Sequence, residues 1–293
     1  MKIGFISDLF NENIIGGAEL NDAVLINSLE QNFLINKCKS SDVTFDFLNQ
    51  NDKFIVSNFV TLPLAFIDYL IVQDKKYIIY EHDHKYVKTR DPSRFMNFQI
   101  PESFLIHREF YKKAEKVVVL SNICKNILEQ NNVSNSVHSI GCSIWSDKTL
   151  DFLRDLQDIK KEYKFGVVES QNPIKGSIEA IKYCKQNNIE PMLIKSSNYY
   201  DFLSKLAKCE TLIFFPQVLE TFSRLAAEAK MLNCELVTIP KMLGFASETY
   251  SMLNGNKLIT KIYNQKNRAL HFFQDWAMEK QDEENERSNI GRY

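Results

Sequence analysis

Two glutamates eight residues apart, Glu220 and Glu228, have the best-defined chemical setting in this chain. The stretch 212–229 predicts a buried strand, a short loop with Glu220, and a helix from Phe222 whose alanine-rich face carries Glu228. A buried carboxylate is costly unless it is paired. The vicinal hydroxyls of a ribose suit it, because one carboxylate can accept hydrogen bonds from both. The alternative is a structural ion pair on the helix surface with Arg224.

A phosphate site is predicted beside these carboxylates. The start of the helix, at Thr221–Ser223, offers free backbone N–H groups to an anion such as pyrophosphate. Lys175 follows the predicted strand Phe165–Val168 and heads another predicted helix, where a positive charge is disfavoured. An anion between Lys175 and that helix would resolve the conflict, whereas the alternative is an ordinary surface lysine.

A glycine pair, Gly16 and Gly17, lies before a predicted helix in the loop 11–19 after the first strand. Glycine allows close backbone approach and positive φ, so a phosphate or carboxylate could bind at this helix start. The pattern is not the GxGxxG fingerprint of dinucleotide sites. An ordinary strand-to-helix turn is the alternative.

Four polar, titratable residues, Glu81–His84, follow the predicted strand Tyr77–Tyr80. We expect this group of residues to contact a sugar or a phosphate directly. A metal site is not expected, because the other histidines supply no evident third ligand in the sequence.

The residues after His82 are candidates for the acceptor side of the site. Asp83, His84, Arg90 and Arg94 occupy the segment that follows the strand. The alternative for the two arginines is a solvated loop.

All of these residues follow predicted strands, and parallel sheets bind ligands beyond the carboxyl ends of their strands. The predicted strands are 3–6, 54–56, 77–80, 117–120, 165–168, 191–194, 212–215 and 236–239. The predicted helices are 18–29, 123–130, 177–186 and 223–232, with a further charged helical stretch in the connection 145–163. Alternation of this kind predicts two similar α/β domains with parallel sheets.

Composition narrows the class of protein. The 293 residues carry a formal net charge of -1, so nucleic acid is not expected as the main partner. Six scattered cysteines without CxxC spacing indicate reduced thiols in a cytoplasmic protein. No apolar run is long enough to span a bilayer, although peripheral membrane contact is compatible with the sequence.

The segment ETFSRLAAEAKMLNCELVT, from Glu220 to Thr238, resembles the Glu-x7-Glu element of retaining glycosyltransferases with the GT-B fold, specifically the family 4 group (glycosyl transferases group 1). Weaker landmarks appear in the family's order over most of the chain, up to about residue 260. They are Gly16–Glu19, His82–Asp83, Ser121, Lys175–Gly176, Gly244–Glu248 and Asn254–Gly255.

The resemblance implies an architecture and a reaction. Two Rossmann-like domains would face each other across a cleft: residues 1–145 on the acceptor side and 146–262 on the donor side. Residues 263–293 would form a helix that crosses back and a charged tail. The enzyme would move a sugar from a nucleotide sugar, UDP- or GDP-linked, to a glycan, a lipid-linked acceptor or another hydroxyl acceptor. It would retain the anomeric configuration and need no metal or other cofactor.

The resemblance also implies roles for individual residues. Glu220 and His82 would be the catalytic residues, with Glu220 holding hydroxyls of the transferred sugar and His82 close to the reaction centre. Glu228 would bind the donor ribose, and Lys175 would neutralise the leaving pyrophosphate. The remaining donor-binding residues would be Gly16, Gly17, Phe222, Ser223 and Arg224.

Departures from the family pattern leave other functions open. Ser170 replaces an arginine that the family places five residues before the phosphate lysine, so Arg224 or Lys195 is expected to supply that charge. Ser223 replaces a glycine, which we expect to be a small change. A nucleotide-sugar epimerase, or a non-catalytic nucleotide-sugar-binding protein of the same fold, is the alternative.

Overall fold

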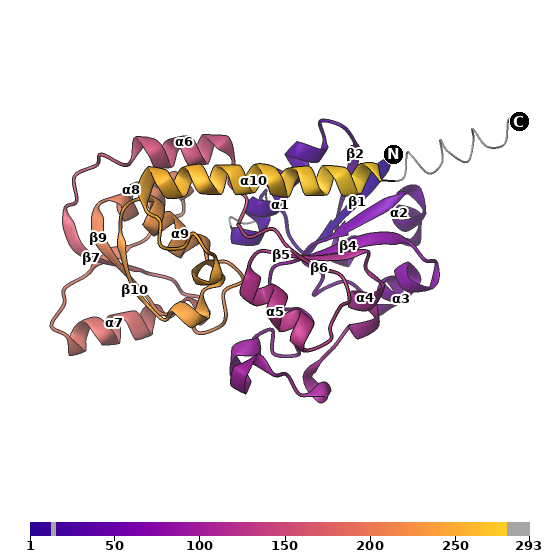
Figure 1. The fold of residues 1–293 in the computed structure, drawn as a ribbon, viewed down its shortest axis with the longest axis horizontal. Helices are drawn as coiled ribbons and strands as arrows, with labels where there is room; N and C mark the ends of the chain where they lie inside the picture. Colours follow the sequence, from indigo (N-terminus) through magenta and orange to yellow (C-terminus); the bar gives the residue numbers. More distant parts are fainter. Residues whose placement is uncertain (13–15, 280–293) are drawn as a thin grey trace, which may run out of the picture.

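The computed structural model describes residues 1–12 and 16–279 and contains two parallel sheets, shown in Figure 1. A six-stranded sheet has the order β2-β1-β3-β4-β5-β6, and a four-stranded sheet has the order β10-β9-β7-β8. Helices alternate with the strands along the chain. The prediction of an α/β protein with two Rossmann-like halves is therefore confirmed.

All eight predicted strands form, together with β2 and β6, which were not predicted. The strands are β1 (Lys2–Ser7), β2 (Leu34–Lys39), β3 (Lys53–Val56), β4 (Lys76–Glu81), β5 (Lys116–Val119), β6 (Val137–Ser139), β7 (Tyr163–Val168), β8 (Met192–Ile194), β9 (Cys209–Phe214) and β10 (Glu235–Thr238). β2 and β6 are the two edges of the larger sheet and are only partly buried. They therefore lack the continuous apolar run of an interior strand.

The four predicted helices also form, and α6 lies in the connection 145–163 as expected. The helices are α1 (Gly17–Leu29), α2 (Phe45–Gln50), α3 (Leu64–Val72), α4 (Arg108–Lys113), α5 (Asn122–Gln130), α6 (Asp147–Asp155), α7 (Ser177–Gln186), α8 (Tyr199–Ala207), α9 (Arg224–Met231) and α10 (Gly255–Met278). Among the described residues, no helix combines the length and the apolar character that crossing a bilayer requires.

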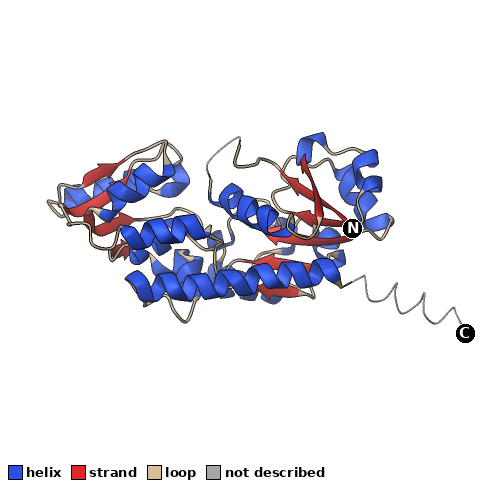
Figure 2. Ribbon diagram, turned by 90° about the horizontal axis from the view of Figure 1, so that it is seen from above, coloured by secondary structure: helices blue, strands red, loops and turns tan. Residues whose placement is uncertain are grey.

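Helix α10 runs along both halves of the molecule, as Figures 1 and 2 show from two directions. Near its end, Lys53 of β3 donates hydrogen bonds to the carbonyl oxygens of Trp276 (2.5 Å) and Ala277 (3.3 Å). Lys266, closer to its middle, pairs with Asp147 of α6. The crossing helix predicted for 263–293 thus begins earlier than expected, at Gly255. The predicted charged tail lies outside the described residues.

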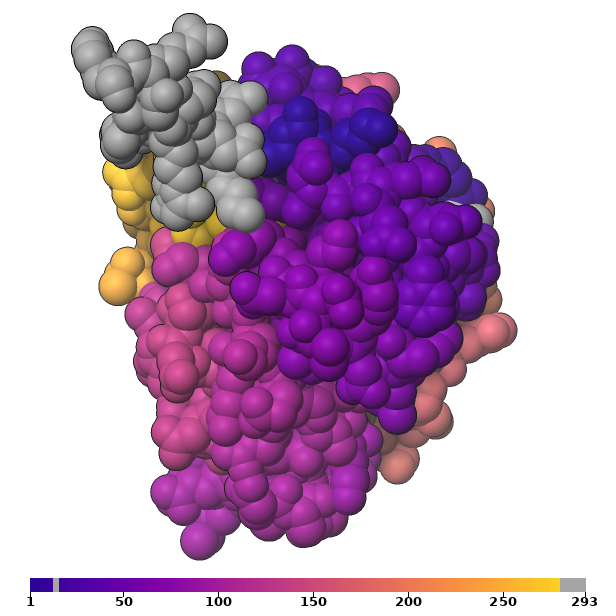
Figure 3. Space-filling model, turned by 90° about the vertical axis from the view of Figure 1, so that its right-hand side faces the viewer, coloured from indigo at the N-terminus to yellow at the C-terminus, as the bar shows by residue number. Residues whose placement is uncertain are grey.

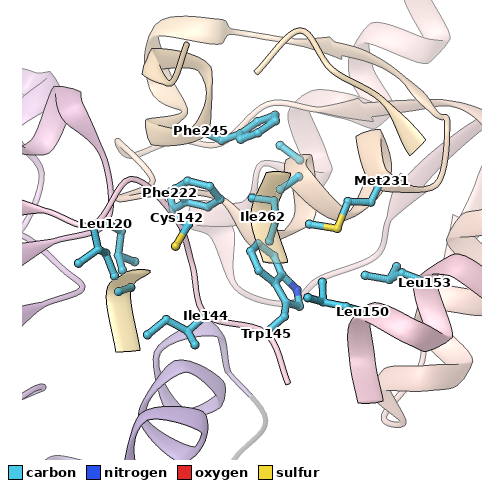
Figure 4. Close-up of a cluster of buried hydrophobic side chains, with 14 of the residues drawn as sticks. Leu120, Cys142, Ile144, Trp145, Leu150, Leu153, Phe222, Met231, Phe245 and Ile262 are labelled. Atoms are coloured by element: carbon cyan, nitrogen blue, oxygen red, sulfur yellow. The ribbon is translucent and has the colours of Figure 1, made fainter. Parts of the chain in front are cut away.

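One hydrophobic cluster joins the two sheets. It contains Phe5 and Tyr80 from the larger sheet, Leu212 and Phe214 from the smaller one, and residues of α10. Figure 4 shows its centre, where Trp145 lies between Phe222 and the leucines of α6. A second cluster fills the other face of the six-stranded sheet. We call the part of the molecule built on the six-stranded sheet the first half and the part built on the four-stranded sheet the second half. Figure 3 shows the end of the molecule formed by the first half, with α10 along its margin.

Candidate functional site

A cavity of about 420 Å³ opens between the two halves. Its walls come from the segments that follow β1, β4, β7 and β9, so it lies at the carboxyl ends of strands from both sheets. The predicted site residues that line it are Gly16, Gly17, His82, Asp83, His84, Arg90, Lys175, Glu220, Phe222, Ser223, Arg224 and Glu228.

Glu228 is buried at the inner wall of this cavity, with 2% of its surface exposed. Its Oε1 accepts hydrogen bonds from Trp145 Nε1 (2.9 Å) and from the hydroxyl of Tyr199. Arg224 Nε lies 3.5 Å from the same oxygen. The pair with Arg224 that was the alternative interpretation therefore forms, but it is buried and does not lie on the helix surface. Burial raises the pKa of the Glu228 carboxyl, and the charge of Arg224 opposes that effect.

Arg224 is held by the protein on several sides. Its guanidinium lies 4.4 Å from the centre of the Trp145 ring and donates to the carbonyl of Ile144 (2.9 Å) and to the Tyr199 hydroxyl (3.0 Å). Lys195, the other expected replacement for the family's arginine, is not among the cavity residues and pairs with Glu169 at 3.4 Å. Of the two, only Arg224 reaches the cavity.

Lys175 and Glu220, which both line the cavity, form an ion pair in which Lys175 Nζ lies 2.8 Å from Glu220 Oε1. Lys175 closes the short 3-10 helix η5 (Pro173–Lys175), and Gly176 then turns the chain into α7 with φ +65°. A Cβ on Gly176 would lie 1.7 Å from the carbonyl oxygen of Phe215, so only glycine fits there. The carboxylate of Glu220 thus lies beside Lys175 in this structure, and the pyrophosphate expected there stays a prediction.

The glycine pair Gly16–Gly17 lets neighbouring side chains come close to the backbone, but its own backbone angles are ordinary. Neither Gly16 nor Gly17 has a positive φ, and Gly16 is extended at φ −121°. A Cβ on Gly16 would lie 2.2 Å from Glu19 Oε2, and one on Gly17 would lie 3.4 Å from Arg224 Cδ. Residues 13–15 of this predicted loop lie outside the described residues.

Ser223, at the start of α9, is more than a small change from glycine. Its φ of +74° lies in the region that favours glycine. Its hydroxyl is buried and has no hydrogen-bond partner among the described residues. One residue of the cavity wall thus carries both backbone strain and an unsatisfied polar group.

His82 is paired with an acid that the sequence analysis missed. Its Nε2 lies 3.2 Å from Oδ1 of Asp22, which is buried in α1. Asp22 also accepts hydrogen bonds from the hydroxyls of Ser7 (3.1 Å) and Ser57 (2.9 Å). Helical periodicity could have found it, because Asp22 precedes the buried Ile26 by one turn and so lies on the inward face.

The predicted acceptor-side residues separate into three environments. His84 is buried, and burial lowers its pKa. Asp83 and Arg90 are partly exposed, face each other at 3.4 Å and line the cavity. Arg94 has a side chain that is 63% exposed, lies 3.5 Å from Asp91 and is not part of the cavity wall. The structure therefore brings three of these four residues to the site.

No family model matches this sequence, and no curated protein is significantly similar to it. Solved structures do match the fold. Sucrose-phosphate synthase of Thermosynechococcus elongatus superposes with a TM-score of 0.62 at 11% identity, covering 94% of this chain and 98% of that one. UDP-GlcNAc 2-epimerase of Methanocaldococcus jannaschii, in complex with UDP-GlcNAc and UDP, gives 0.50 at 14% identity, covering 91% and 93%. The Anabaena protein HepE, in complex with UDP, gives 0.50 at 13% identity, covering 94% and 100%.

The chain has the GT-B fold. In this fold the cavity lies between the two Rossmann-like halves, and every wall segment described above follows a strand of one of them. Within residues 1–12 and 16–279, no group of three or more His, Cys, Asp or Glu side chains is arranged to hold a metal ion. The polar groups at the centre of this GT-B cleft are instead the paired charges Lys175–Glu220 and Arg224–Glu228.

Proposed function

We propose that the protein is a retaining, family 4-like glycosyltransferase that uses a UDP- or GDP-linked sugar and a glycan or glycolipid acceptor. One observation carries the proposal. A single strand-loop-helix unit, β9 to α9, places Glu220 and Glu228 in the same cavity, with Lys175 beside Glu220 and the start of α9 between them. A nucleotide sugar presents a ribose, a pyrophosphate and a sugar in that order.

The proposed reaction uses these groups in sequence. Glu228 accepts hydrogen bonds from the ribose hydroxyls, and Glu220 accepts them from the transferred sugar. The N–H groups at the start of α9 stabilise negative charge on the departing pyrophosphate. Lys175 is 40% exposed, so it can turn from Glu220 toward a phosphate oxygen. The acceptor hydroxyl forms its bond to the anomeric carbon from the side of the leaving group, while the bond from that carbon to the phosphate oxygen breaks. The departing phosphate oxygen takes the hydroxyl proton, so the reaction needs no general-base carboxylate of the glycosidase kind.

Glu228→Gln tests the donor assignment with little change in volume. A nucleotide at about 100 times its Kd adds roughly 2.7 kcal/mol of stability, which raises Tm by several degrees. In a thermal-shift panel of UDP, GDP, ADP and CMP with their common sugars, we expect one nucleotide to stabilise the wild type and not the variant. Glu248→Gln, which changes a buried carboxylate outside the cavity, is the matched control.

Two results would count against the proposal. A full wild-type shift in Glu228→Gln would remove the ribose assignment. The absence of a shift with every nucleotide in the wild type would reject a nucleotide-sugar substrate altogether.

A nucleotide-sugar epimerase is the second candidate, and the buried His82–Asp22 pair favours it. Such a pair can hold an imidazole in one orientation for proton transfer. Incubating the stabilising nucleotide sugar without an acceptor separates the two functions. An epimerised sugar supports this second candidate, whereas transfer that appears only on addition of an acceptor supports the first.

A further inference from the structure

Both backbone polar atoms of Leu219, the residue before Glu220, are bonded across the cleft to the first half of the molecule. Leu219 N donates to Asp91 Oδ1 at 3.3 Å, and Leu219 O lies 3.2 Å from Nε2 of His84. Both polar atoms of one peptide segment are therefore used by side chains of the opposite domain. We call these two contacts the Leu219 clamp.

Thr221, the residue after Glu220, is also hydrogen-bonded to the first half. The Thr221 hydroxyl donates to the carbonyl of His82 at 2.9 Å, and Thr221 O accepts from the Ser121 hydroxyl at 2.7 Å. Glu220 thus stands between two neighbours that are both bonded to the first half, although its own backbone N–H and C=O bond to Met242 and Gly244 of the second.

The side chain of Leu219 also belongs to the opposite domain. It is 2% exposed and packs in the hydrophobic cluster that otherwise consists of residues of the first half, including Tyr86 and Ile100. His84 and Asp91 are themselves buried. The clamp therefore operates inside a packed interior, where a hydrogen bond is hard to replace with one to water.

The hydrogen bonds of His84 determine which of its ring nitrogens carries a proton. Its Nδ1 faces the hydroxyl of Tyr86 at 3.1 Å, and its Nε2 faces Leu219 O. Because a carbonyl can only accept, Nε2 must carry a proton for this bond to form. His84 was predicted to contact an acceptor, but both of its nitrogens are occupied by the protein.

From this geometry we infer that His84 and Asp91 are positioning residues that set the place of Glu220 over the transferred sugar. The inference rests on the proposed function, in which Glu220 binds the sugar and Glu228 binds the nucleotide. Lys175 and the backbone partners of Glu220 all belong to the second half, so they fix Glu220 relative to the nucleotide. The clamp fixes it relative to His82 and the acceptor side.

The decisive readout is the affinity that the sugar adds to the nucleotide. Titration calorimetry would compare UDP with UDP-glucose, or the equivalent pair that stabilises the wild type. In His84→Ala and Asp91→Ala we expect the gain in affinity from the sugar to fall about tenfold, equivalent to about 1.4 kcal/mol. The affinity for the nucleotide alone should stay within about twofold, since Glu228 is untouched.

Conservative variants separate positioning from general damage. In His84→Gln the amide nitrogen can still donate to Leu219 O, and in Asp91→Asn the amide oxygen can still accept from Leu219 N. Both should recover most of the sugar's contribution. Glu248→Ala is the matched control, because it removes bonds to Asn122 (2.8 Å and 3.0 Å) between the same two halves, and Glu248 has no hydrogen bond to residues 219–221 among the described residues. Equal losses for UDP and UDP-glucose, or an equal loss in the control, would overturn the inference.

A second measurement needs no substrate. Hydrogen–deuterium exchange of peptides covering residues 217–223 should be faster in His84→Ala and Asp91→Ala than in the wild type, and close to the wild type in Glu248→Ala. Unchanged exchange in both clamp variants would overturn the clamp even if nucleotide sugars bind. Conversely, faster exchange in both clamp variants, together with a wild type that binds no nucleotide sugar, would preserve the clamp and reject the proposed function.

Discussion

At the scale of single residues, Ser223 combines two costs in one place. A non-glycine residue in the left-handed region is strained by about 1–3 kcal/mol, and Ser223 has φ +74°. Its buried hydroxyl without a partner adds a desolvation cost of similar size. Because Ser223 lies in the cavity wall, the strained residue is one that a bound ligand would contact.

We expect Ser223→Gly to stabilise the protein, since glycine adopts positive φ freely and removes the unsatisfied hydroxyl. Glycine also increases the freedom of the unfolded chain, so the net gain should be about 1 kcal/mol. For a protein of this size that gain raises Tm by roughly 2–4 °C. Scanning calorimetry on the ligand-free protein measures it.

Ser223→Ala is the comparison, because it removes the hydroxyl and keeps the side chain at the strained φ. A smaller rise in Tm for alanine than for glycine would assign the difference to the backbone. A fall in Tm for Ser223→Gly would show that the conformation of Ser223 carries no strain.

At the scale of elements, the segment after β4 is organised by a buried ion pair. Lys85 Nζ lies 2.7 Å from Glu81 Oε1, and the hydroxyl of Tyr111 donates to the other carboxylate oxygen. Burial alone would raise the pKa of Glu81, but Lys85 and the hydrogen bonds outweigh it and lower the pKa from 4.5 to about 2. This pair fixes the start of the loop that carries His82 and His84.

Lys85→Met should cost about 3–5 kcal/mol, because it leaves the Glu81 carboxylate buried without its partner. The double variant Glu81→Gln with Lys85→Met should recover much of that loss. Urea unfolding at neutral pH measures both. If the single and double variants were equally unstable, the pair would not be the cause.

The same pair gives a dependence on pH with a definite sign. Glu81 has a lower pKa folded than unfolded, so its contribution is complete above about pH 4.5 and is lost as pH falls toward 2. As pH falls from about 4.5 toward 2, the free energy of unfolding should therefore decrease less in Glu81→Gln than in the wild type, as acid unfolding experiments would measure.

The sequence predicted the interior strands of both sheets and the edge strands β8 and β10 of the smaller sheet, but it missed β2 and β6, the edges of the larger one. β3, β4 and β5 are buried on both faces and read as apolar runs, whereas β2 and β6 border the sheet and alternate with polar residues. In the site, the local strand-loop-helix pattern placed Glu220 and Glu228 in one cavity. The partners Trp145 and Tyr199 could not be predicted, because no local pattern links them to Glu228.

At the scale of the whole molecule, α10 joins the halves through its last turn. Lys53 is buried in β3, bonds to the carbonyls of Trp276 and Ala277, and lies 4.7 Å from the centre of the Trp276 ring. The amide carbonyls at a helix end have no partner within the helix. A lysine from the sheet therefore completes the end of α10.

We expect Lys53→Met to destabilise this docking by about 1–3 kcal/mol, because buried carbonyls lose their donor while the apolar stem is kept. Hydrogen exchange should quicken at residues 270–279 more than in the core strands. Lys112→Met, which removes an exposed pair with Glu109 within α4, is the control. Equal effects of the two substitutions would contradict a specific role for Lys53.

The bond between Lys53 and Trp276 joins residues separated by 223 positions in the chain. A ribosome adds about 5–20 residues per second. β3 is therefore synthesised on the order of ten seconds or more before the helix turn that its lysine caps. Once β6 has been made, the first sheet has all of its strands but not yet the helix that lies over them. The order of synthesis thus makes the docking of α10, and with it the bond between Lys53 and Trp276, a late step in folding.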